Sequence, residues 1–163
     1  MTSLRLDSAT YFQVDLQMLK LIPLKRYVTN EAENEGLPRY NVFIASLTDE
    51  PGRGEIATQL LNENHEFCTS ILNLMEIRSV MTKKKRVEQS RVESVLSDIY
   101  GSVDIYAPEI SDQIAAYELQ RDNLLYTIDC VLPALANDVD ATMVTFDGEL
   151  LDHGAVAPKD LID

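Results

Sequence analysis

Residues 129–147 have the sequence DCVLPALANDVDATMVTFD, and this stretch decides the fold class. An acid opens a run of apolar residues, 129–136, that is typical of a helix. A polar turn separates this run from the short apolar segment 142–145, which is typical of a buried strand. A second acid, Asp147, follows that segment and precedes a glycine. The pattern predicts a helix that begins at Asp129 and a strand after it, with Asp147 directly following the strand.

The same alternation continues along the rest of the chain. Short apolar or alternating pieces are found at residues 41–47, 66–69, 103–106 and 155–156. Helix signals are found at residues 48–62, 70–81, 87–100 and 111–120. Strands separated by helices predict an α/β fold with a largely parallel sheet. Sites in such folds lie at the carboxyl ends of the strands.

A polar segment divides the chain. Residues 29–38 carry three glutamates and end in Gly36 and Pro38, which predicts a loop or linker. We therefore place a boundary there, with residues 39–163 as the main domain. Residues 1–38 are then an N-terminal extension or a displaced first strand, and the sequence leaves both alternatives open.

Composition restricts the function classes. The 163 residues fit one compact domain, and 27 acidic against 14 basic residues give a net charge of −13. This charge repels nucleic acid at long range, so it is either surface charge suited to a salt-rich cytoplasm or partly a carboxylate cluster that holds cations. No apolar run is long enough to span a membrane and no secretion signal is seen, so a cytoplasmic location is expected.

Three acids are candidates for such a cluster. Glu76 lies on a predicted helix between apolar residues one turn away on each side, Asp129 opens a helix, and Asp147 follows a strand. Each has an ordinary alternative, as a charge at the edge of a helix stripe, a helix cap or a turn residue. At one sheet edge, three carboxylates would repel unless they were protonated or joined by cations. Mg²⁺ prefers such oxygen ligands and can activate water for phosphodiester hydrolysis.

Residues 41–158 resemble a PIN domain of the VapC toxin type. Residues 41–45, NVFIA, resemble the end of the family's opening motif, and residues 69–77, TSILNLMEI, resemble its second motif with Glu76 as the acid. The helix that Asp129 opens resembles the third motif, and Thr145-Phe-Asp147 resembles the fourth.

The resemblance implies a three-layer α/β/α sandwich around a mostly parallel sheet. It implies an endoribonuclease that cleaves RNA with Mg²⁺ or Mn²⁺, with Glu76, Asp129 and Asp147 as catalytic residues and metal ligands. Such a chain would be the toxin of a toxin–antitoxin pair. Its expected partners are the RNA substrate, an antitoxin protein and a second copy in a homodimer.

One position departs from the family pattern. The family has an aspartate two places before Asn41, where this chain has Arg39. Asp7, at the end of a strand-like segment of residues 3–8, is one candidate for the missing metal ligand. In the other alternative, Arg39 neutralises the acids without metal, and the chain is a degenerate PIN domain that binds RNA or protein without catalysis.

Overall fold

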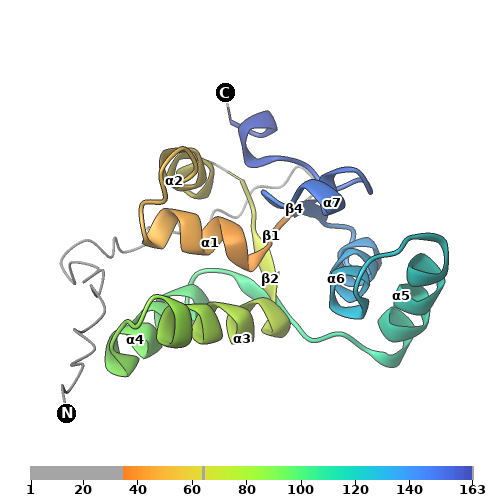
Figure 1. Ribbon diagram of the computed structural model, residues 1–163, viewed down its shortest axis with the longest axis horizontal. Coiled ribbons are helices and arrows are strands. Elements are labelled where there is room, and N and C mark those ends of the chain that lie inside the picture. Colours follow the sequence, from red (N-terminus) through yellow and green to blue (C-terminus); the bar gives the residue numbers. More distant parts are fainter. Residues whose placement is uncertain (1–34, 64, 163) are drawn as a thin grey trace, which may run out of the picture.

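The computed structural model describes residues 35–63 and 65–162 (Figure 1). Asp7 and the predicted strand of residues 3–8 lie outside the described residues. No helix within the described ranges is long and apolar enough to cross a membrane. The elements in chain order are β1 (Gly36–Pro38), α1 (Tyr40–Leu47), α2 (Gly54–Asn62), β2 (Cys68–Ser70), α3 (Ile71–Ser79), the π-helical turn η1 (Val80–Lys84), α4 (Gln89–Tyr100), β3 (Asp104–Tyr106), α5 (Ile110–Asp122), α6 (Thr127–Asp138), β4 (Thr142–Val144), α7 (Gly148–Leu151) and the 3₁₀ turn η2 (Pro158–Asp160).

The strands form two parallel pairs that lie next to each other. β1 pairs with β4, and β2 pairs with β3. A single bridge between Gly36 and Phe67 joins the pairs, and a bridge from Val144 to Val156 extends the far edge. The resulting order is β3, β2, β1 and β4, with every described pairing parallel. Because the strands are parallel, their carboxyl ends share one edge.

The prediction of a loop at residues 29–38 is wrong for the last three of these residues, which form strand β1. The short strand Gly36–Pro38 is fully buried and central. Glycine at its start gives room for a neighbour, since a Cβ on Gly36 would lie 3.0 Å from the ring of Phe67. Proline is tolerated because it is the last residue of the strand, where the ladder ends. Composition alone therefore missed the strand.

Helix α1 corrects the strand-like interpretation of residues 41–47. All of its residues from Val42 to Leu47 are buried. A helix that is buried on all sides has no polar face, so its sequence lacks the 3.6-residue period that distinguishes it from a strand. The other predicted helices and strands are present, except that residues 48–53 form a turn before α2 and residues 155–156 contribute only a bridge at Val156.

Helices cover both faces of the sheet, which confirms the predicted α/β/α sandwich. Helices α1 to α4 lie on one side of the strands, and α5 and α6 lie on the other (Figure 1). Neighbouring residues of β4 point to opposite sides, because Val144 belongs to the first core and Met143 to the second. This alternation follows from the two-residue period of a strand.

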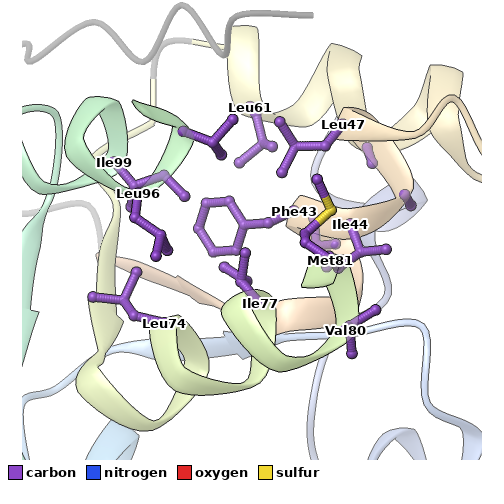
Figure 2. Packing of buried hydrophobic residues seen from close by; sticks show 14 of the residues in the cluster. Phe43, Ile44, Leu47, Leu61, Leu74, Ile77, Val80, Met81, Leu96 and Ile99 are labelled. Carbon is purple, nitrogen blue, oxygen red and sulfur yellow. The ribbon is translucent and has the colours of Figure 1, made fainter. Parts of the chain in front are cut away.

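The larger core centres on Phe43. Figure 2 shows its ring surrounded by side chains from four helices, among them Leu47 of α1, Leu61 of α2, Ile77 of α3 and Ile99 of α4. Phe43 itself is completely buried. This packing fixes α1, and with it the end of β1 from which α1 starts.

Candidate functional site

A buried arginine joins two aspartates at the carboxyl edge of the sheet. Arg39 directly follows β1, Asp147 follows the neighbouring strand β4, and Asp129 lies in the first turn of α6. The Nη1 atom of Arg39 donates to Oδ2 of Asp147 at 2.7 Å, and its Nη2 atom donates to Oδ1 of Asp129. The structure therefore brings together two of the three predicted acids, with a cation between them.

Asp147 uses both of its carboxylate oxygens. While Oδ2 accepts from Arg39, Oδ1 accepts from the backbone N–H of Glu149 at 3.0 Å, so that Asp147 also caps α7. The backbone N–H of Asp147 donates to the hydroxyl of Thr145 at 3.1 Å. The turn interpretation and the site interpretation of Asp147 are thus compatible.

Asn41 and Thr145 hold the two strand ends in register. The amide of Asn41 donates to Oγ1 of Thr145 at 3.0 Å, and its Oδ1 accepts from the backbone N–H of Phe146 at 3.4 Å. The backbone N–H of Arg39 donates to the carbonyl of Val144 at 2.8 Å. These bonds place Arg39 and Asp147 side by side.

Asn73 is a site residue that sequence reasoning missed. This fully buried side chain of α3 accepts from the backbone N–H of Tyr40 at 3.2 Å and donates to the carbonyl of Pro38 at 3.2 Å. It therefore hydrogen-bonds the backbone on both sides of Arg39. The sequence signal that could have identified Asn73 is its position between Leu72 and Leu74, because a polar residue buried in a helix needs specific partners.

Glu76, the third predicted acid, is exposed on α3. Within residues 35–63 and 65–162, no group of three or more His, Cys, Asp or Glu side chains is placed to hold a metal ion. Asp129 lies at the third position of α6 and not at its cap, which is Tyr126. Its carboxylate still benefits from the positive end of the helix dipole.

The residues present at this edge do not fit a divalent ion. Arg39 engages one oxygen of each aspartate and the α7 cap engages the second oxygen of Asp147, so three of the four carboxylate oxygens of the pair already have partners. Arg39 is only 7 % exposed, so its charge lies where the ion would have to enter. A divalent ion beside the Arg39 guanidinium would be repelled strongly, because both are positively charged and little water screens them there.

The described cysteines do not offer a nucleophile. Burial raises the pKa of the Cys68 thiol far above its usual range, and the carboxylate of Glu35 beside it raises this pKa further. Burial also raises the pKa of Cys130. Since the thiolate is the reactive form, both thiols stay protonated and inert at neutral pH.

Comparison with known proteins identifies the fold. A toxin–antitoxin complex from Klebsiella pneumoniae contains a chain that is 20 % identical, with a TM-score of 0.60 over 76 % of this chain and 98 % of that chain. VapC20 of Mycobacterium tuberculosis, a sarcin–ricin loop cleaving toxin, is 16 % identical, with a TM-score of 0.62 over 74 % and 95 %. VapBC2 of Rickettsia felis, bound to a DNA fragment from its promoter, is 17 % identical, with a TM-score of 0.57 over 74 % and 95 %.

No curated relative matches the sequence. The family model of the PIN domain matches residues 41–155. This match spans more than half of the chain and includes Asn41, Glu76, Asp129 and Asp147, while Arg39 lies two residues before it. The chain belongs to the PIN-domain family.

Proposed function

We propose that this chain is a PIN-domain protein that acts by binding a protein partner and does not hydrolyse RNA with a divalent ion. The observation that carries the proposal is the pairing of Arg39 with both Asp129 and Asp147. A PIN nuclease needs these carboxylates to hold metal, whereas here they hold a side chain of the same molecule. The net charge of −13 further disfavours RNA as the partner.

A second candidate function is the metal-dependent endoribonuclease of a toxin–antitoxin pair. It is favoured by family membership and by the fold shared with a sarcin–ricin loop cleaving toxin. In this alternative Glu76, Asp129 and Asp147, with Asp7, would hold Mg²⁺ or Mn²⁺, and an antitoxin would inhibit the enzyme. It requires that Arg39 leave the two carboxylates.

An RNA cleavage assay separates the two candidates. We expect wild type and Asp147→Asn to leave a fluorescent pool of single-stranded RNAs equally intact in Mg²⁺, Mn²⁺ or EDTA, because no divalent ion is held. High KCl is used to screen the acidic surface. A nonspecific ribonuclease serves as the positive control. Divalent-dependent cleavage that Asp147→Asn abolishes would instead establish the endoribonuclease.

An apolar face on three helices supports the binding role. A cavity of about 660 Å³ is lined by Leu72 of α3, Val131 of α6 and the start of α5. Large apolar side chains lie exposed on the same helices: Ile71, Met75, Ile110, Ile114, Tyr117 and Ile128. Exposed apolar side chains gathered beside such a cavity are typical of protein–protein contact sites. We propose that a second copy of the chain covers this face.

The dimer is tested by sedimentation equilibrium at high KCl. We expect Ile114→Ser to weaken self-association about tenfold, since the loss of one central apolar contact costs about 1.4 kcal/mol. The matched control is Tyr100→Ser on α4, because Tyr100 is 54 % exposed and Ile114 is 56 % exposed. A wild type that stays monomeric at all concentrations would contradict this part of the proposal.

A further inference from the structure

We propose that Arg39 is the resident cation of this centre, and that the chain becomes a divalent-ion binder when Arg39 is replaced by a short residue with a side-chain oxygen. The inference rests on the proposed function, because it explains how a PIN domain keeps its acids together without metal. It goes further in stating that one side chain keeps a cation site closed.

The guanidinium joins the two acids as one ion would. Its two terminal nitrogens go to different carboxylates, Nη1 to Asp147 and Nη2 to Asp129. The remaining nitrogen, Nε, is buried and has no hydrogen-bond partner among the residues that the structure describes. Within the described part of the chain, the hydrogen bonds of this side chain therefore all go to the acid pair. A lysine, which has a single nitrogen, would not reproduce this planar fork.

Burial makes the pairing exclusive. The side chains of Arg39 and Asp129 are 8 % and 15 % exposed, and that of Asp147 is 34 % exposed. Charges in such a place interact more strongly than in water, so the acids need a cation and a second cation is repelled. Wild type therefore has no vacancy for Mn²⁺ at this edge.

The backbone holds the cation at a fixed point. The N–H of Arg39 is bonded to β4, and the residues on both sides of it are bonded to Asn73. The ring of Tyr40 lies 5.2 Å from the guanidinium carbon. An aspartate at position 39 would start from the same fixed backbone, at the end of β1 and beside the end of β4. Three carboxyl groups at one strand edge form a ligand set that suits a hard divalent ion.

The test is calorimetric titration of the full chain with MnCl₂. We expect Arg39→Asp to bind Mn²⁺ at least tenfold more tightly than wild type, and the added change Asp147→Asn to remove this gain. Arg53→Asp is the matched control, because it makes the same change of charge close to Asp147. Arg53 is exposed, and its guanidinium lies 5.3 Å from the ring of Phe146. Arg53→Asp should bind no better than wild type.

Repulsion among three acids can prevent Arg39→Asp from folding without metal, so Arg39→Asn is measured in parallel. Melting followed by circular dichroism should show that Mn²⁺ raises the Tm of the Arg39 variants and leaves that of wild type unchanged. Wild type that binds Mn²⁺ as tightly as Arg39→Asp would overturn the inference. Folded Arg39→Asp or Arg39→Asn without any gain would overturn it too. The proposed function fails on a different result, which is divalent-dependent RNA cleavage by wild type.

Discussion

Replacing Arg39 by methionine is expected to lower the free energy of unfolding by about 3 kcal/mol. Methionine keeps most of the length of the side chain but removes the charge that lies between Asp129 and Asp147. Two carboxylates then face each other in a poorly solvated place, with no counterion. The expected loss is at the lower end of the range for a broken buried pair, because the Asp147 side chain is one-third exposed.

Urea denaturation of the full chain at low salt measures this effect. Adding Asp129→Asn and Asp147→Asn to Arg39→Met removes the repulsion and should restore most of the lost stability. Arg53→Met, which removes an exposed arginine nearby, should change the stability by less than about 0.5 kcal/mol. If Arg39→Met is as stable as wild type, the two aspartates do not need the charge of Arg39. Both proposals would then lose the pairing on which they rest.

Replacing Phe43 by alanine is expected to cost about 3–5 kcal/mol, the usual range for a buried phenylalanine. The ring lies completely buried where α1, α2, α3 and α4 meet (Figure 2). Removing it leaves a cavity that four separate elements would have to close, so relaxation recovers little. Because typical domains are stable by only 5–15 kcal/mol, the variant should lie near its folding limit at 37 °C.

Thermal melting gives the direct comparison. Tyr100→Ala is the control, since Tyr100 is large and aromatic but 54 % exposed. Its Tm should stay within a few degrees of wild type, whereas that of Phe43→Ala should fall far below it. A loss of less than 1 kcal/mol in Phe43→Ala would mean that α1 is not anchored by this core.

The positions of Asp129 and Asp147 could be predicted from sequence because they follow from local rules. A strand followed by an acid and a glycine placed Asp147, and the parallel topology placed it on the same edge as the start of α6. The resemblance to the PIN family, which has an aspartate two places before Asn41, is what identified Arg39 as a departure. The sequence could not predict which cation the two acids bind, because whether Arg39 reaches both of them depends on the packing of β1 against β4.

The parts that were missed share one physical cause. Strand β1 has three residues and α1 is buried on every side, so neither carries the periodic signal on which sequence reasoning depends. Asn73 was missed because its role is set by backbone groups more than 30 residues away. The exposure of Glu76 likewise depends on how α3 is docked.

The way in which the sheet is joined has a consequence for the third acid. Arg39 and Asp147 belong to the pair β1–β4, while Glu76 lies on the helix that follows β2 in the other pair. The Gly36–Phe67 bridge, the side chain of Asn73 and the core packing of Phe43 against Ile77 join these two halves. The offset between the halves, and not the chemistry of Glu76, therefore sets its distance from the other acids.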